Sequence, residues 1–362
     1  MLLGITGFEI RYQLRNPVFW VAFLFFFLLG FGLTASANVS LGTPGAVHEN
    51  APSAVAIAMA AFGMFYLFVT TAFVANAIVR DDSTGFGPMV RASAVTKTDL
   101  VLGRFAGGLI ISLLGYLSVP LGLAVGASMP WVDPETVGSM GIVNYAWHYL
   151  IIALPNIFIA SAFLMALATT FRSMMATYIG LIVFLIGYTF TNVIIGSMPE
   201  YLPTFAKFEL LGLAAVQDMT RYWTTAELNS RLLPLTGNLL FNRVLVVALG
   251  AAILAATVWR FSMSERAPSK RKLRRLAKKQ AAEAKLAQDC PTPLEGNIRP
   301  SYGPATSFAQ LRARTGSEVM QVLKSPGLIV ILILAIFNTA GELLTTRTQY
   351  GTPSYPLTAN VI

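Results

Sequence analysis

The chain of 362 residues carries little charge for its length. Hydrophobic residues make up 55% of it and charged residues 12%, about half the charged share of a typical soluble domain. This composition excludes an ordinary soluble enzyme and a disordered or fibrous protein. The formal net charge of +9 would be compatible with binding to nucleic acid if the basic residues were spread over the surface, so their positions in the chain matter. The single cysteine excludes a disulfide framework and a CxxC metal site.

Apolar runs separated by charge predict seven membrane-spanning helices, because only helices satisfy the backbone in lipid when no barrel pattern exists. The runs are residues 18–36, 52–79, 105–129, 147–170, 174–198, 244–259 (extended by 239–241) and 326–340. They contain no Asp, Glu, Lys or Arg, which argues against a proton relay or an ion-coupled transporter. Asn76, Asn156 and Asn192 are the notable polar residues inside them, and Pro120 and Pro155 are candidate kinks.

The basic residues place the N-terminus in the cytoplasm. Most of the 26 lysines and arginines then lie in cytoplasmic segments, as the positive-inside rule requires. The exceptions, assigned to outer loops, are Lys207, Arg221, Arg231, Arg243 and Arg347. The longest outer loop, residues 199–238, contains a capping-box pattern at Thr224 and Glu227 that predicts a short helix.

Two segments of the chain match at a constant offset of 309 residues. Glu9, Arg15 and Pro17 correspond to Glu318, Lys324 and Pro326, and Gly42-Thr43-Pro44 corresponds to Gly351-Thr352-Pro353. In each copy an amphipathic segment ends in a basic residue before a proline, which predicts an interfacial helix that turns into a span. Six spans separate the copies, so we expect a second, parallel repeat that begins near residue 308 and is truncated. The recurrence also argues against cleavage of the first span as a signal peptide.

Residues 266–285 hold most of the net charge. We expect this basic, helix-forming stretch to bind anionic lipid headgroups at the membrane surface, and we expect no nucleic acid as a partner. The expected headgroup ligands are Lys270, Arg271, Lys272, Arg274, Arg275, Lys278 and Lys279. A topology anchor that continues the sixth span is the simpler alternative. Residues 289–307 are rich in proline and glycine and predict a flexible connector.

The segment after the second span mixes acidic, basic and small residues. Its candidate functional residues are Arg80, Asp81, Asp82, Gly85, Arg91, Lys97, Asp99, Gly103 and Arg104. The order of acidic residues, a glycine, a stretch of small residues with a basic residue, and a closing Leu-x-x-Gly-Arg resembles the corresponding loop of type-2 permeases of ATP-binding cassette (ABC) exporters. The resemblance implies that this segment faces the ATPase and couples nucleotide turnover to the membrane subunit. The alternative interpretation is a solvated loop that obeys the positive-inside rule.

The resemblance extends over residues 1–261 as one six-span unit, and residues 2–16 are similar to the elbow helix of these permeases. The duplicated layout with a polar linker, together with residues 220–229, Gly237 and Asn242-Arg243, resembles the membrane part of bacterial permeases fused to a zinc aminopeptidase. The implied domains are an interfacial elbow helix (1–17), a six-span permease unit (18–261), a basic and Pro/Gly-rich cytoplasmic linker (262–307), and a second elbow helix with the seventh span and the start of an outer loop (308–362).

Catalytic motifs are absent from the sequence. It has no GxxxxGK[ST] phosphate-binding loop, and neither of its histidines, His48 and His148, belongs to an HExxH zinc motif. We therefore expect no enzyme activity, no metal and no cofactor in this chain. An ATPase or a peptidase would lie outside it.

These patterns predict an all-α integral membrane protein: a six-span helical bundle plus a seventh span that opens a second, parallel repeat, with a cytoplasmic N-terminus. The expected function is that of a permease subunit of an ABC-type exporter in the bacterial inner (plasma) membrane, which moves substrate by alternating access driven by a separate ATPase. The expected partners are a soluble P-loop ATPase, membrane lipids, and a second permease half or a second copy of the chain. The alternatives are a membrane anchor or scaffold for a peptidase domain without transport, and an ion-coupled secondary transporter.

Overall fold

Six helices in the described residues are long and apolar enough to span a membrane, which supports a multi-pass membrane protein. They run over Pro17–Ala35, Pro52–Asp81, Lys97–Ala127, Ile142–Phe171, Met174–Asn192 and Gly237–Arg260. These helices overlap the first six predicted spans, whereas the predicted seventh span, residues 326–340, lies outside the described residues. The computed structural model describes residues 1–36, 47–138, 141–197, 199–263, 277, 303–323, 348–349 and 352–353.

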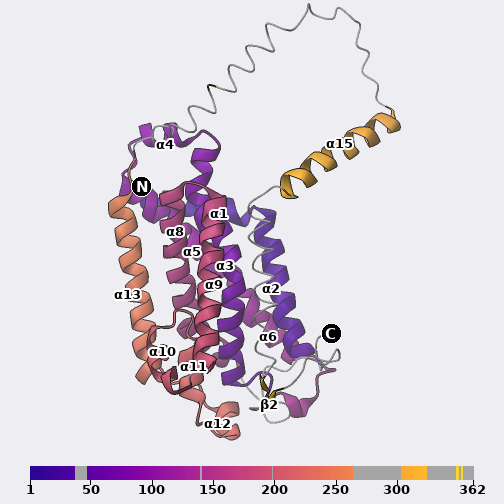
Figure 1. Ribbon diagram of the computed structural model, residues 1–362, viewed down its shortest axis with the longest axis vertical. Coiled ribbons are helices and arrows are strands. Elements are labelled where there is room, and N and C mark those ends of the chain that lie inside the picture. The colour runs from indigo at the N-terminus through magenta and orange to yellow at the C-terminus, as the bar shows by residue number, and fades with distance from the viewer. Residues whose placement is uncertain are drawn as a thin grey trace, which may run out of the picture. The chain divides into compact units, whose positions relative to one another are not determined.

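The chain divides into two units, residues 1–262 and 263–362. The first unit begins with α1 (Leu2–Leu14), α2 (Pro17–Ala35), α3 (Pro52–Ser83), α4 (Gly87–Ala92), α5 (Lys97–Tyr116) and α6 (Ser118–Ala127). It continues with the 3₁₀ turn η1 (Pro134–Thr136), α7 (Ile142–His148), the π-helical turn η2 (Tyr149–Ala153), α8 (Leu154–Phe171), α9 (Met174–Ser197) and the 3₁₀ turn η3 (Pro199–Tyr201). It ends with α10 (Leu202–Phe208), α11 (Leu213–Thr220), α12 (Thr225–Ser230) and α13 (Gly237–Arg260) (Figure 1).

Prolines set several helix starts and interruptions. α2 begins at Pro17 and α3 at Pro52, a first-turn position where an amide hydrogen has no helical acceptor. The third span breaks between α5 and α6 just before Pro120, because proline cannot donate to the carbonyl group four residues earlier. The π-helical turn η2 precedes Pro155 in the fourth span. Both prolines that were predicted as kinks therefore coincide with irregular helix geometry.

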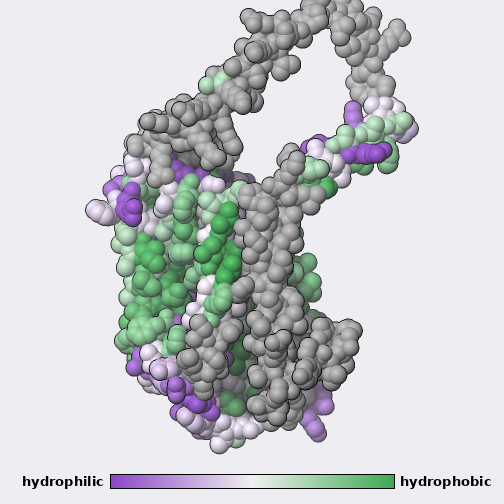
Figure 2. Space-filling model, viewed as in Figure 1, coloured by the Kyte–Doolittle hydropathy of each residue, from purple (hydrophilic) through white to green (hydrophobic). Residues whose placement is uncertain are grey.

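Helix α3 lies at the centre of the first unit and packs against α5, α8 and α9. α8 also packs on α13, and α2 on α6 (Figure 1). The buried side chains at these contacts include large aromatics, among them Tyr66, Phe73 and Tyr116. A hydrophobic band crosses the middle of this unit and hydrophilic residues gather at its two ends, as Figure 2 shows. This surface is what a bilayer would require of a membrane-embedded bundle.

Short helices lie at the two ends of the first unit. α10, α11 and α12 occupy one end, and α4 lies at the other end with the N-terminus (Figure 1). The helix predicted at Thr224 is confirmed as α12. The Thr224 Oγ1 accepts the amide of Glu227 at 3.3 Å, and the Glu227 carboxylate accepts the amide of Thr224 at 2.9 Å. Local capping chemistry therefore starts this helix as expected.

In the second unit the structure describes one long helix and one short pair of β-strands. α15 (Pro304–Leu323) covers most of the predicted second interfacial segment, and β1 (Thr348–Gln349) pairs antiparallel with β2 (Thr352–Pro353). α1 and α15 end at Leu14 and Leu323, two positions that correspond in the predicted repeat. The expected headgroup ligands from Lys270 to Lys279 lie outside the described residues, as do Lys324 and Pro326.

Candidate functional site

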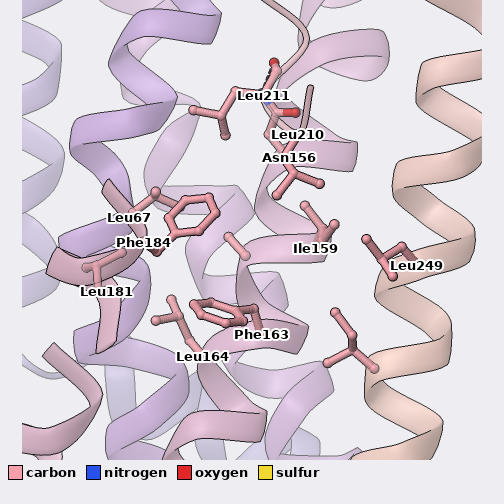
Figure 3. Close-up of a pocket in the computed structure, with 12 residues that line it drawn as sticks. Leu67, Asn156, Ile159, Phe163, Leu164, Leu181, Phe184, Leu210, Leu211 and Leu249 are labelled. Atoms are coloured by element: carbon pink, nitrogen blue, oxygen red, sulfur yellow. Dashed lines mark hydrogen bonds between the residues drawn. The ribbon is translucent and has the colours of Figure 1, made fainter. Parts of the chain in front are cut away.

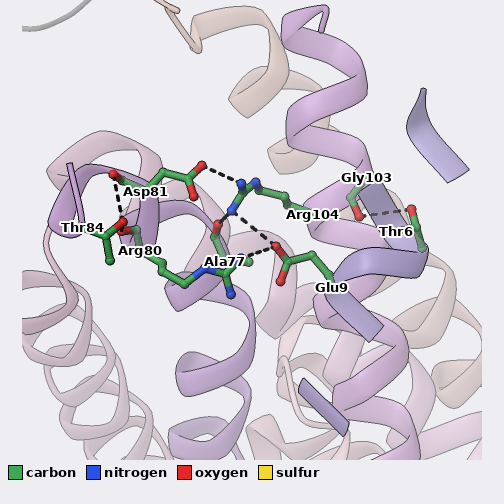
Figure 4. A network of polar contacts seen from close by, with 8 residues as sticks. All are labelled: Thr6, Glu9, Ala77, Arg80, Asp81, Thr84, Gly103 and Arg104. Atoms are coloured by element: carbon green, nitrogen blue, oxygen red, sulfur yellow. Dashed lines mark hydrogen bonds and ion pairs between the residues drawn. The ribbon is translucent and has the colours of Figure 1, made fainter. Parts of the chain in front are cut away.

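A buried ionic network joins three helices at the end of the bundle that carries α4 (Figure 4). At its centre is Glu9 of α1, whose side chain is 1% exposed. Arg80 Nη2 of α3 lies 2.6 Å from Glu9 Oε1, and Arg104 Nη1 of α5 lies 3.4 Å from the same oxygen. Arg104 also pairs with Asp81 at 2.5 Å and donates to the carbonyl oxygen of Ala77. Two acids and two bases balance, so these four side chains carry no net charge.

Glycines in α5 bring α1 close enough to form the network. A β-carbon at Gly107 would lie 2.5 Å from Cβ of Glu9, and one at Gly103 would lie 2.9 Å from Cβ of Ile5. Thr6 adds a hydrogen bond from Oγ1 to the carbonyl oxygen of Gly103 at 3.2 Å. The predicted elbow segment is therefore a helix whose polar face is fixed to the third span.

Arg80 also contacts two aromatic rings of α1. Its guanidinium carbon lies 4.1 Å from the ring centroid of Tyr12 and 5.9 Å from that of Phe8. The two rings stack with their centroids 6.1 Å apart. A cation over an aromatic face is stabilised by about 0.5–2 kcal/mol, depending on how far water is excluded. Arg80 is thus held to α1 by an ion pair and by the aromatic pair.

The network divides the predicted coupling residues into two groups. Those that face inward are Arg80, Asp81, Gly103 and Arg104. Those nearer the surface are Gly85, Lys97 and Asp99. The side chains of Asp82 and Arg91 lie outside the part of the chain that the structure describes. The surface group is accessible to a partner, whereas the inward group is engaged in contacts within the unit.

Helix α4 presents apolar side chains beside the surface group. Phe86 is 56% exposed and Met89 is 66% exposed, whereas Gly87 is buried. Gly85 connects α3 to α4 with φ at 73°, a left-handed conformation that favours glycine. Large apolar side chains that are exposed beyond the hydrophobic band are typical of an interaction surface.

The two predicted elbow helices differ in the environment of their matching glutamates. Glu9 is buried, whereas the side chain of Glu318 in α15 is 64% exposed and pairs with Arg314 at 3.2 Å. Arg15 is exposed just after α1, and Pro17 opens α2 as predicted. Both predicted elbow segments are therefore helical, and the ion pair described for the second is exposed whereas those of the first are buried.

A second buried polar cluster was not predicted from the sequence. The assignment of Arg243 to an outer loop is wrong, because this residue lies within α13 and is 4% exposed. Its Nη1 donates to Oδ1 of Asn156 in α8 at 2.8 Å, and its Nε donates to Oδ1 of Asn242 at 2.9 Å. The signal that could have revealed it is the polar Asn242-Arg243 pair directly after the apolar residues 239–241. A charged residue thus lies inside a helix that is long and apolar enough to span a membrane, so the charge-free apolar runs do not exclude an ion-coupled transporter.

The loop between α10 and α11 packs onto Arg243. Its Glu209 is 7% exposed and accepts a hydrogen bond from the amide of Leu211 at 2.6 Å. Asn242 Nδ2 donates to the carbonyl oxygen of Glu209 at 2.7 Å. Gly212 has φ at 82°, and a β-carbon there would collide with the Arg243 guanidinium. Polar groups of α13 thus hold this loop inside the bundle.

An apolar cavity of about 150 Å³ lies next to the polar cluster (Figure 3). Among its lining residues Asn156 is polar, and its Nδ2 donates to the carbonyl oxygen of Leu211 at 2.7 Å. The apolar walls from α3, α8, α9 and α13 include Leu67, Phe163, Leu181, Phe184 and Leu249. A cavity of this lining accommodates an apolar group better than it accommodates water.

Within the described ranges, no group of three or more His, Cys, Asp or Glu residues is placed to hold a metal ion. The sequence matches no family model and no curated protein.

Proposed function

We propose that the chain is the membrane-spanning permease subunit of an ABC-type exporter, in which a separate ATPase drives alternating access. The observation that supports this most directly is that Phe86, Met89 and Lys97 are exposed in residues 86–97, between the parts of α3 and α5 that the ionic network joins. An ATPase that moves this surface would act on α1, α3 and α5 together, because breaking a buried ion pair costs about 3–5 kcal/mol. The resemblance of residues 80–104 to the loop of type-2 permeases supports the same partner.

The proposed setting is the bacterial inner membrane, with the N-terminus and α4 in the cytoplasm. The distribution of basic residues supports this orientation. A second permease half or a second copy of the chain would complete the transport pathway. The corresponding ends of α1 and α15 support a second, parallel repeat.

Binding of the ATPase tests this proposal. The tagged chain, purified from its native cell, is expected to carry a soluble P-loop ATPase in near-equal amount. The double substitution Met89→Asp/Lys97→Glu is expected to weaken this association about tenfold, a change of ~1.4 kcal/mol. The matched control Tyr222→Asp/Lys207→Glu alters exposed residues near α10 and α12 at the other end of the bundle and is expected to leave the association intact.

Three outcomes of this binding experiment would contradict the proposal. They are the absence of any P-loop ATPase, equal loss of ATPase from both variants, and recovery of a peptidase alone, which would favour an anchor or scaffold. Transport that survives ATP depletion and follows an ion gradient would favour the secondary transporter. The buried Arg243 would then be the first residue to test.

A further inference from the structure

A hollow of about 500 Å³ lies at the corner between α1 and α2. Its lining residues are Phe8, Arg11, Tyr12, Arg15, Asn16 and Pro17. It thus combines two arginines, two aromatic rings and the turn into the first span. Neither arginine belongs to the ionic network around Glu9. We call this feature the corner hollow.

The corner hollow carries positive charge that no carboxylate in the described part of the chain balances with an ion pair. Arg11, in the last turn of α1, and Arg15, the residue that follows α1, are four positions apart and both exposed, whereas Glu9 is buried. Like charges at this spacing repel each other and destabilise a helix. Among the residues that the structure describes, neither arginine forms an ion pair, and the carboxylates of the nearby network are balanced by their own arginines. The two guanidiniums are therefore available to an external anion.

The position of the corner hollow relative to α2 places it at the membrane surface. Val18, Val21 and Leu24 of α2 are between 49% and 68% exposed, as expected of side chains that face lipid. Trp20 is 58% exposed, and its Nε1 donates to the carbonyl oxygen of Leu14 at 2.9 Å. Tryptophan concentrates at the membrane–water interface, the level at which lipid phosphates lie.

We propose that the corner hollow binds the phosphate group of an anionic phospholipid, with Arg11 and Arg15 as its ligands. A guanidinium presents a fork of N–H donors that matches phosphate oxygens, and two guanidiniums complement a net negative headgroup. Phe8 and Tyr12 provide apolar surface for the lipid beneath its phosphate. This site is additional to the basic linker, and it requires the membrane location of α2 but not the proposed transport function.

Lipid binding to the purified 362-residue chain in detergent tests the proposal. Native mass spectrometry counts bound phosphatidylglycerol and gives its Kd. In every protein compared, the linker residues are replaced by glutamine so that they do not contribute: Lys270, Arg271, Lys272, Arg274, Arg275, Lys278 and Lys279. In this background Arg11→Gln/Arg15→Gln is expected to weaken phosphatidylglycerol binding about 30-fold, at ~1 kcal/mol per basic residue. The matched control Arg312→Gln/Arg314→Gln removes two exposed arginines from α15 and is expected to leave the Kd unchanged.

Other probes separate a lipid from a free anion. Phosphatidylcholine is expected to bind about tenfold more weakly than phosphatidylglycerol, because its headgroup carries its own cation. Displacement of phosphatidylglycerol by equimolar inorganic phosphate would overturn the lipid assignment. Equal binding by the two double variants, or equal loss in both, would overturn the site. The single substitutions Arg11→Gln and Arg15→Gln, each expected to weaken binding about fivefold, decide the question if the double variant does not fold.

Discussion

Glu9 is a carboxylate at the edge of the apolar bundle with almost no exposed surface. Removing such a group from water costs several kcal/mol unless opposite charges and hydrogen bonds replace the solvent. Arg80 and Arg104, from two different helices, provide the opposite charges for Glu9, and Arg104 also pairs with Asp81. Without the charge of Glu9, Arg80 would lose this ion pair, whereas Arg104 would keep its pair with Asp81.

The substitution Glu9→Gln is expected to lower the free energy of unfolding by about 3 kcal/mol, because it leaves buried positive charge without its partner. Equilibrium unfolding of the purified chain in detergent measures this change. The matched control is Glu318→Gln, at the corresponding position of the predicted repeat, where the side chain is 64% exposed. That control is expected to cost less than about 0.5 kcal/mol. Equal effects at the two positions would show that the network does not stabilise the unit.

Arg243 shows where reasoning from single residues fails. An arginine beside an apolar run resembles a loop residue, because an unpaired charge is costly in lipid. Here Asn156, which lies 87 positions earlier in the chain, accepts one of its hydrogen bonds. Glu209 adds a negative charge from the loop between α10 and α11. The packing of α8 and α13 brings these groups together, and no short stretch of sequence contains them all.

The contact between α1 and α5 depends on how closely two helices can approach. Gly103 and Gly107 form a Gly-x-x-x-Gly pattern on the face of α5 that meets α1. Small residues at this spacing let helices pack with little distance between their backbones. The pattern is visible in the sequence, but the sequence does not show that an interfacial helix, rather than another span, occupies it.

The substitution Gly107→Ala is expected to displace α1 and to destabilise the contact by about 2 kcal/mol through overpacking. Hydrogen–deuterium exchange over residues 2–14 should then become faster. Gly7→Ala in α1 is the matched control, because no atom lies within 4 Å of a β-carbon at that position. It should slow exchange, since alanine favours a helix over glycine by about 1 kcal/mol. Exchange that changes in the same direction in both variants would contradict the close packing of α1 on α5.

Helix boundaries were predictable where local chemistry sets them, as at Pro17, Pro52 and Thr224. They were not predictable around the coupling segment. The sequence predicted spans that end at residue 79 and restart at 105, but α3 continues to Ser83 and α5 starts at Lys97. Charged residues end an apolar run without ending a helix, because a helix can continue wherever its charges find partners or water.

At the scale of the whole first unit, the two polar ends are built differently. One end holds the ionic network and α4, and the other holds the short helices α10, α11 and α12 (Figure 1). A hydrophobic band separates these ends (Figure 2). If the band lies in a bilayer, the two ends face opposite compartments.

Labelling of single cysteines is expected to show this arrangement. In a background with Cys290→Ser, Ser93→Cys lies just after α4 and Tyr222→Cys between α11 and α12, both at exposed positions. A membrane-impermeant maleimide should label Tyr222→Cys in intact cells and Ser93→Cys only after permeabilisation, because the proposed orientation puts α4 in the cytoplasm. The reverse pattern would invert the orientation, and labelling of both positions from one side would contradict the six spans.

The sequence by itself determined that the chain is helical and multi-pass, where its first six spans lie, and where Pro120, Pro155 and the capping box alter helix geometry. Those features depend on the length of apolar runs and on chemistry within a few residues. Only the tertiary structure decided which charges are buried. In the sequence Glu9 and Arg243 look like ordinary polar residues, because their partners belong to other helices and are far away along the chain. The burial of a charge depends on those partners, and partners far apart in the sequence meet only when the helices pack.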